Sequence, residues 1–141
     1  MAYKGIFTPK NKTKYRGTIN NIIYRSLWER RFMKWCDENP AIIKWSSEEL
    51  TIPYISPVDR KWHRYYPDFY IKLKTKNNEI VEHIVEIKPK KQTKRPINKN
   101  RKKFLSEAKT YSINEAKWKA ATIYCKKRKW TFKILTEDHI L

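Results

Sequence analysis

The sequence predicts an α/β domain in which helices flank a small mixed β-sheet. Three observations support this prediction: a helical apolar pattern comes first, two strand-like segments follow it, and a second helical stretch precedes a short alternating segment. The chain has 141 residues, enough for one domain whose core needs neither disulfides nor a metal. We expect that domain to span residues 1–141, with a basic arm over about residues 1–22 and a basic loop over about residues 89–101.

The composition indicates a folded protein with a polyanionic partner, for which nucleic acid is the default. Lysine and arginine number 33 against 14 acidic residues, and the net charge of +19 exceeds what solubility alone requires. Hydrophobic residues make up 40% of the chain, which excludes a disordered basic tail. No apolar run reaches the ~18 residues of a membrane span, so we expect a non-secreted protein without membrane contacts. Cys36 and Cys125 stand alone in helical stretches and are expected to be buried, reduced thiols.

The first predicted helix covers about residues 26–38. Its apolar side chains fall within a single arc of about 180° on a helical projection. They are Leu27, Trp28, Phe32, Trp35 and Cys36. Asn39-Pro40 ends the helix, because the residue before a proline disfavours helical conformation. Short extended segments are expected next, at residues 42–45 and 49–54, followed by a loop over residues 56–61.

Residues 62–73 and 80–88 are predicted to form an antiparallel hairpin, with the polar stretch 74–79 as its turn. The register is set by the hydrophobic pattern, because a slip of one residue would move apolar side chains to both faces. The favoured register places Asp68 directly opposite Glu86. One face then carries Phe69, Ile71, Leu73, Val81, Val85 and Ile87.

Pro89 lacks a backbone donor, so the second strand of the hairpin should end directly after Lys88. Nine of the sixteen residues from 88 to 103 are basic and none is acidic, which predicts a mobile cationic loop. Helical patterning resumes over about residues 102–111 and 114–128. Residues 130–135 then alternate as a closing strand of the sheet.

The hairpin brings Asp68, Glu86 and Lys88 onto one face at neighbouring strand ends, so two carboxylates and an ammonium converge. Mg²⁺ prefers oxygen ligands and binds through one or two protein carboxylates, which leaves positions for water and phosphate. The alternative is a surface ladder of charges worth ~0–1 kcal/mol. The pattern is short and its residues are common, so other parts of the chain must decide between the two.

Glu29 is the first of these other parts, because the helical projection places it toward the core side of residues 26–38. A carboxylate there needs a hydrogen-bonded, ionic or metal partner, since an unpaired buried charge is strongly unfavourable. The alternative is a capping box, in which Glu29 reaches back to the Ser26 amide, with Arg25 as an ion-pair partner. Both interpretations remain open at this point.

Several segments carry a resemblance to a known family. They are Lys14-Tyr15-Arg16-Gly17, Tyr24-Arg25-Ser26 with Trp28-Glu29, Ile52-Pro53-Tyr54, Glu86-Ile87-Lys88-Pro89-Lys90, Lys117-Trp118-Lys119-Ala120-Ala121 and Ile134-Leu135-Thr136-Glu137-Asp138. On these segments the chain resembles, almost from end to end, the head-completion nuclease family of contractile-tailed phages. That family belongs to the PD-(D/E)XK nucleases and is similar to the TnsA-like transposon endonucleases. Its four motif positions match Glu29, Asp68, Glu86 and Lys88.

The resemblance implies a restriction-endonuclease-like sandwich and Mg²⁺-dependent cleavage of double-stranded DNA, with Mn²⁺ as a substitute. Asp68 and Glu86 would hold the metal, Glu29 would complete its coordination or orient a second ion, and Lys88 would position the attacking water. The implied role is to trim or guard packaged DNA ends during head completion, before tail attachment. Portal or neck proteins would then be partners, and the protein would act in the host cytoplasm during assembly or reside in the virion head or neck.

The basic loop and the start of the following helix are interpreted as a DNA clamp that contacts phosphates rather than base edges. The clamp residues are Lys90, Lys91, Lys94, Arg95, Lys102 and Lys103. If each neutralises one phosphate, log affinity should fall with log salt at a slope of roughly 5. The alternative is a solvated charged face with no ligand.

The sequence therefore favours a metal-dependent DNA endonuclease. The alternative from another class is a non-catalytic DNA-binding structural protein of the phage head or neck. A third interpretation is a basic protein that binds RNA or the ribosome. Cleavage that requires a metal, Asp68 and Lys88 would separate the first interpretation from the other two.

Overall fold

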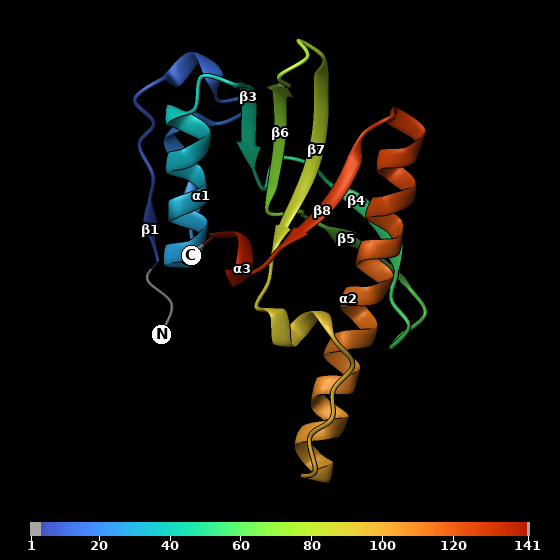
Figure 1. The fold of residues 1–141 in the computed structure, drawn as a ribbon. Helices are drawn as coiled ribbons and strands as arrows, with labels where there is room; N and C mark the ends of the chain where they lie inside the picture. The colour runs from blue at the N-terminus through green and yellow to red at the C-terminus, as the bar shows by residue number, and fades with distance from the viewer. Residues whose placement is uncertain (1–3, 141) are drawn as a thin grey trace.

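The central sheet has four strands in the order β3-β6-β7-β8 in this computed structural model, which describes residues 4–140 (Figure 1). These strands are β3 (Ile42–Ser47), β6 (Phe69–Lys74), β7 (Ile80–Ile87) and β8 (Thr131–Leu135). The first three are antiparallel neighbours, whereas β8 runs parallel to β7. Helix α1 (Leu27–Glu38) packs on one face and α2 (Arg101–Arg128) on the other. The predicted α/β sandwich with a mixed sheet is confirmed.

Two small antiparallel sheets and several short helices complete the described chain. They are the pair β1 (Gly5–Ile6) and β2 (Ile23–Tyr24), the pair β4 (Ile52–Ile55) and β5 (Trp62–Tyr65), the 3-10 helices η1 (Lys12–Lys14), η2 (Ile19–Asn21) and η3 (Lys90–Thr93), and α3 (Glu137–Ile140). The periodicity of the sequence predicted none of the three 3-10 helices and neither α3 nor the β1-β2 pair, because elements this short carry no periodic pattern to detect.

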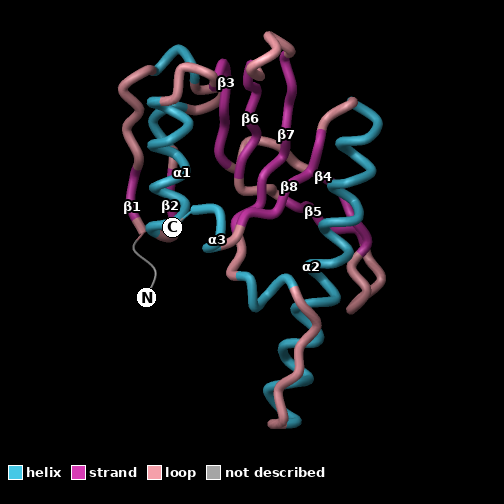
Figure 2. The backbone as a smooth tube through the Cα atoms, in the orientation of Figure 1, coloured by secondary structure: helices cyan, strands magenta, loops and turns pink. Residues whose placement is uncertain are grey.

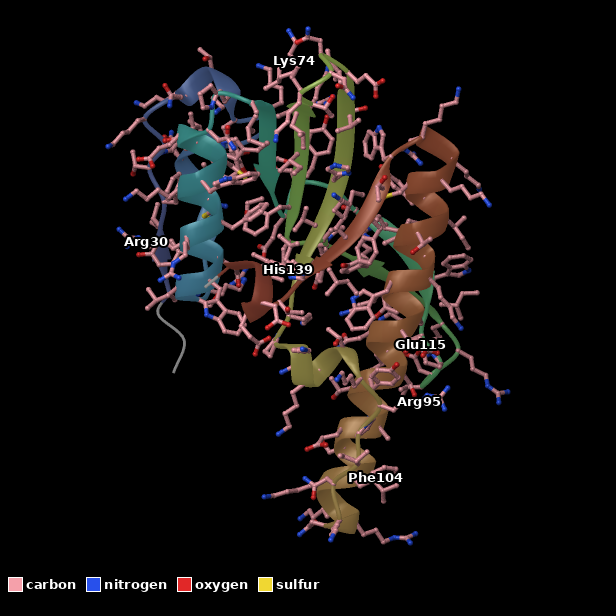
Figure 3. All side chains as sticks on the ribbon, in the orientation of Figure 1. Arg30, Lys74, Arg95, Phe104, Glu115 and His139 are labelled. Carbon is pink, nitrogen blue, oxygen red and sulfur yellow. The ribbon has the colours of Figure 1, made fainter. Side chains whose placement is uncertain are left out.

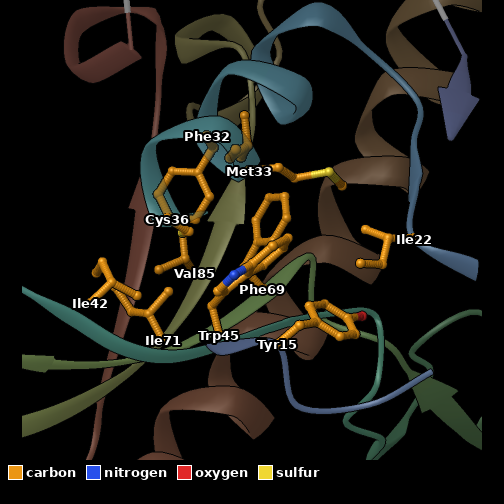
Figure 4. Packing of buried hydrophobic residues seen from close by; sticks show 11 residues of the cluster. Tyr15, Ile22, Phe32, Met33, Cys36, Ile42, Trp45, Phe69, Ile71 and Val85 are labelled. Carbon is orange, nitrogen blue, oxygen red and sulfur yellow. The ribbon is translucent and has the colours of Figure 1, made fainter. Parts of the chain in front are cut away.

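Alternation along β7 divides the hydrophobic core into two clusters, one on each face of the sheet. Val85 and Ile87 face α1, in a cluster shown in Figure 4. That cluster also contains Tyr15, Ile22, Phe32, Met33, Cys36, Ile42, Trp45, Phe69 and Ile71. Ile84 faces α2, in a second cluster with Ile52, Tyr54, Tyr65, Ala121 and Cys125. Cys36 and Cys125 are free, buried thiols as predicted.

The predicted register of the hairpin is confirmed. Phe69 pairs with Val85 and Leu73 pairs with Val81, so continuing the ladder by one position brings Asp68 to Glu86. Strand β7 ends at Ile87, two residues before Pro89, and the Lys88 amide donates to the carbonyl of Leu135 on β8 at 2.9 Å.

Two element boundaries differ from the sequence-based expectation. Residues 62–73 form two strands rather than one, because β5 pairs with β4, and Pro67 between β5 and β6 has no amide to continue a ladder. The two helical stretches predicted on either side of residues 112–113 are one continuous α2 of 28 residues. Neither glycine nor proline interrupts it, so a gap in the apolar pattern does not break the helix.

The basic arm packs onto the domain over its described residues; its first three lie outside them. The Asp37 carboxylate at the end of α1 accepts bonds from the backbone amides of Lys10 and Asn11, both at 2.9 Å. Tyr15 is buried, and the Arg16 amide donates to the Trp45 carbonyl at 2.8 Å. Residues of the arm therefore extend the α1 face of the core.

The first half of α2 projects beyond the sheet, and the basic loop runs beside it (Figure 2). Residues of α2 enter the hydrophobic core only from Ile113 onward. We call residues 101–112 the projecting half of α2. Asn100 caps it, because the Asn100 side chain accepts a bond from the Lys103 amide at 3.1 Å.

Candidate active site

The end of β3, the start of β6 and the end of β7 meet at one edge of the sheet, because β6 is antiparallel to both neighbours. The first turn of α1 reaches the same place. Glu29 lies in that turn, Glu48 directly follows β3, Asp68 directly precedes β6, and Glu86 is the penultimate residue of β7. Four carboxylates therefore gather at this edge, three of which were predicted from the sequence.

Glu29 belongs to a capping box and to the carboxylate group at the same time. Its amide donates to the Ser26 hydroxyl at 3.2 Å, and its carboxylate accepts bonds from the Arg25 amide and the Ser26 hydroxyl, both at 3.4 Å. The backbone partner is thus the Arg25 amide rather than the expected Ser26 amide. Glu29, Glu48 and Asp68 each offer one carboxylate oxygen, and these three oxygens lie within 4.8 Å of one another.

Glu48 was not predicted to belong to the site. Its backbone φ of 55° is uncommon for a residue other than glycine, and such conformations are concentrated at functional sites. This conformation follows the last residue of β3, where the Glu48 amide donates to the Asp68 carbonyl at 3.1 Å. The predicted ion pair between Arg25 and Glu29 is not formed, since the Arg25 guanidinium binds both Glu48 oxygens, at 3.1 and 3.0 Å.

Glu86 is the most enclosed of the four carboxylates, with 5% of its surface exposed. The Tyr65 hydroxyl donates to it at 2.6 Å, the Asp68 amide donates at 3.4 Å, and the Lys88 ammonium lies 3.9 Å away. The Asp68 carboxylate in turn accepts a bond from the Ile87 amide at 2.8 Å. Asp68, Glu86 and Lys88 therefore lie together as the register predicted, and Asp68 stands between Glu86 and the Glu29–Glu48 pair.

The electrostatics of the cluster fit a bound cation. Burial, and next the nearby Glu86 charge, raise the pKa of Asp68 well above its ordinary value. Burial also raises the pKa of Glu86 and that of Glu29. Desolvated carboxylates that lie beside other carboxylates are unfavourable when ionised, and a divalent cation would offset this cost. The donors are all oxygen atoms, the type that Mg²⁺ and Mn²⁺ prefer.

Lys117 of α2 is a cation of the site that sequence patterns did not single out. Burial lowers its pKa, which the charges of Glu86 and Asp68 partly oppose. Its ammonium lies 5.6 Å from the ring centroid of Tyr65 and 5.9 Å from that of Tyr54. The only indication in the sequence was that Lys117 opens one of the segments that carry the family resemblance.

The predicted DNA clamp is divided in the structure. Lys90 is held by α3, because its ammonium lies 3.0 Å from Asp138 and its amide donates to Glu137 at 2.6 Å. Lys91, Lys94 and Arg95 line a cavity of about 640 Å³ between the basic loop and α2. Lys102 and Lys103 lie in the first turn of the projecting half of α2, where both are exposed.

The fold and the carboxylate edge are those of a restriction-endonuclease-like protein, and comparison with known proteins gives the family. The chain belongs to the TnsA-like endonuclease family, because the model described as "TnsA-like endonuclease N terminal" matches residues 39–137. It is also 44% identical over 144 residues to the "Head completion nuclease" of Enterobacteria phage T4, an alignment that covers 98% of this chain and 93% of that protein. No solved structure gives a significant match.

The family match begins after α1. It therefore includes Glu48, Asp68, Glu86 and Lys88 but not Glu29. Within residues 4–140, no helix combines the length and the apolarity that a membrane span requires.

Proposed function

We propose that this protein is a metal-dependent DNA endonuclease that acts on packaged phage DNA ends during head completion, before tail attachment. Its family is one of endonucleases, and the name of its phage T4 relative supports the head-completion role. The observation that carries the proposal is the meeting of Asp68, Glu86 and Lys88 at one sheet edge, where the two carboxylates have raised pKa values.

Asp68 and Glu86 are the residues proposed to hold the metal, with Glu29 as a third ligand. Glu48 lies close enough to Asp68 and Glu29 to replace or join that third ligand. A bound Mg²⁺ or Mn²⁺ would supply Lewis-acid polarisation of the phosphate and a more acidic water. The Ile87 amide fixes one Asp68 oxygen, which orients this carboxylate before any ligand arrives.

The nearby cations and Tyr65 have separate roles in this proposal. Lys88, 3.9 Å from Glu86, would orient the attacking water and offset the negative charge that develops on the phosphate. Tyr65 holds Glu86 in place by its 2.6 Å bond. Lys117 would bind a phosphate oxygen, since it lies on α2 near enough to feel the charges of Glu86 and Asp68.

Double-stranded DNA is the proposed substrate, and the clamp residues would contact its backbone. Lys91, Lys94 and Arg95 follow Lys88 closely along the chain, so a duplex at the site passes the basic loop. Portal or neck proteins are the proposed protein partners. We place the protein in the host cytoplasm during assembly or in the virion head or neck.

A cleavage assay tests the proposed activity. Supercoiled and linear duplex DNA are incubated with the protein in Mg²⁺, Mn²⁺ or EDTA, together with the variants Asp68→Asn and Lys88→Met. Cleavage should require a metal and should fall by roughly 100-fold or more in each variant. The matched control is Lys74→Met, since Lys74 ends β6 at the opposite edge of the sheet (Figure 3). This variant should cleave DNA as the wild type does.

Two outcomes would replace the proposal. DNA binding without cleavage in any metal would favour the non-catalytic structural role in the head or neck. Binding of RNA in preference to duplex DNA, unchanged by Asp68→Asn, would favour the RNA-associated role.

A further inference from the structure

The cavity between the basic loop and α2 is lined by a buried asparagine of α2. Asn114 lines this cavity and is 8% exposed. Asn114 therefore presents both a donor and an acceptor to whatever occupies the cavity.

The rest of the lining has the composition of a nucleotide site. Tyr111, one turn before Asn114 on α2, offers a half-buried aromatic ring. Lys91, Lys94 and Arg95 bring positive charge from the loop side. Glu107, the acidic residue of the lining, already accepts a bond from the Asn98 amide at 3.2 Å. The volume of about 640 Å³ is within the range of pockets that hold small organic ligands, ~300–1,000 Å³.

The cavity adjoins the carboxylate edge along both of its walls. On the helix wall, Asn114 and Lys117 are three residues apart and so lie on the same face of α2, about 4.5 Å apart along the axis. On the loop wall, Lys91 follows Lys88 by three residues, a reach of at most about 11 Å. A DNA strand whose phosphate meets Lys117 would thus have a neighbouring nucleotide at the cavity.

We propose that this cavity binds an unpaired nucleotide of a single-stranded extension, so that the substrate is duplex DNA with an overhang or flap. The Tyr111 ring would stack on the base, the Asn114 amide would bond the base edge, and the loop cations would hold the flanking phosphates. A base paired within a duplex cannot enter, because its edge and both faces are already occupied. The inference rests on the proposed DNA endonuclease function and adds the form of DNA that the site selects.

The test compares binding of a short blunt duplex with binding of the same duplex carrying a short unpaired extension, by fluorescence anisotropy in EDTA so that no cleavage occurs. The wild type should bind the extended DNA roughly tenfold more tightly. A 2-aminopurine in the extension should lose fluorescence on binding as it stacks on Tyr111. Equal affinity for both DNAs, or an unchanged 2-aminopurine signal, would overturn the proposal.

Variants assign the preference to the cavity. Asn114→Leu should remove most of the preference for extended DNA, because leucine has neither the donor nor the acceptor that would bond the base edge. Asn77→Leu is the matched control, since Asn77 is an exposed turn residue between β6 and β7 and should keep the full preference. If Asn114→Leu does not fold, Tyr111→Leu serves instead, and Tyr111→Phe should retain the stacking. A preference that survives Asn114→Leu and Tyr111→Leu contradicts the proposal.

Cleavage of plain duplex separates this proposal from the one on which it rests. If the wild-type protein cuts blunt duplex in Mn²⁺ but shows no preference for the extension, the cavity proposal is wrong and the endonuclease proposal is supported. If the protein prefers the extension but cuts no DNA in any metal, the cavity proposal is supported and the endonuclease proposal is wrong.

Discussion

Asp68 stands between two glutamates with different surroundings. On one side, Glu86 is 5% exposed and is held by the Tyr65 hydroxyl at 2.6 Å. On the other side, the Glu48 side chain is 31% exposed, and both its oxygens are occupied by the Arg25 guanidinium. The first carboxylate is bonded by a neutral hydroxyl, with the Lys88 ammonium 3.9 Å away, whereas the second has its charge offset by a bidentate guanidinium.

This difference indicates where a divalent metal would gain most. A metal bound between Asp68 and Glu86 would relieve repulsion in a desolvated site, whereas one bound to Glu48 would first have to displace Arg25. We infer that the Glu86 side carries the metal and that the Arg25–Glu48 pair borders the site. Each prediction below tests that distinction.

The largest expected difference is between Glu86→Gln and Glu48→Gln. We expect Glu86→Gln to lower the rate of single-turnover cleavage by roughly 100-fold or more, because it removes a metal ligand. Glu48→Gln should lower the cleavage rate by less than about tenfold, as expected for a residue that neighbours the metal ligands without binding the metal itself. Calorimetric titration with Mn²⁺ should rank the affinities of the two variants in the same order. Equal losses, or a larger loss in Glu48→Gln, would place the metal on the Arg25 side.

The second prediction concerns the bond that holds Glu86. Tyr65→Phe removes the donor and should weaken Mg²⁺ binding about tenfold, since groups that orient metal ligands have effects of this size. Tyr70→Phe is the matched control, because the Tyr70 hydroxyl also donates to a glutamate, Glu82 on β7. Tyr70→Phe should leave Mg²⁺ binding unchanged, and equal losses in the two variants would show a general loss of stability instead.

The sequence predicted the Glu86 side of this comparison better than the Glu48 side. Asp68, Glu86 and Lys88 follow from strand alternation and a register fixed by the hydrophobic pattern, both of which are local. Glu48 lies after a strand end, in a backbone conformation that no pattern indicates. Lys117 is one lysine of a strongly basic chain, and only the packing of α2 brings it to the site.

The contact between Tyr65 and Glu86 was also not predictable from the sequence, for a different reason. Residues 62–73 were expected to form one strand, in which Tyr65 would be part of the hairpin with β7. The structure pairs Tyr65 with Ile52 instead, and from this separate two-stranded sheet the Tyr65 hydroxyl donates to Glu86. Long-range pairing decided this contact, and a period-two pattern is the same for one strand or two.

The third prediction is a gain of stability when the central charge is removed. Because the pKa of Asp68 is raised in the folded state, its ionised form is less favourable there than in the unfolded chain at neutral pH. Asp68→Asn should therefore raise the melting temperature in EDTA, by about 2–4 °C for each kcal/mol of repulsion relieved. Mg²⁺ should raise the melting temperature of the wild type but not of the variant.

A control acid separates this effect from a general change in net charge. Asp138 is exposed and forms an ion pair with Lys90, so Asp138→Asn should change the melting temperature little and should retain the Mg²⁺ effect. A drop in the melting temperature of Asp68→Asn in EDTA would mean that the bond from the Ile87 amide outweighs the repulsion.

The smallest expected effect comes from Arg25→Gln. The Arg25–Glu48 ion pair is exposed, with 51% of the Arg25 side chain accessible. Its loss should therefore cost ~0–1 kcal/mol of stability, and less at high salt. Glu48 would then be free to act as a ligand, and Mn²⁺ affinity should rise by up to about fivefold. The gain should vanish in the double variant Arg25→Gln with Glu48→Gln, because no carboxylate is left to release. A gain that persists in the double variant would mean that Arg25 repels the cation directly, and that Glu48 does not take part in binding.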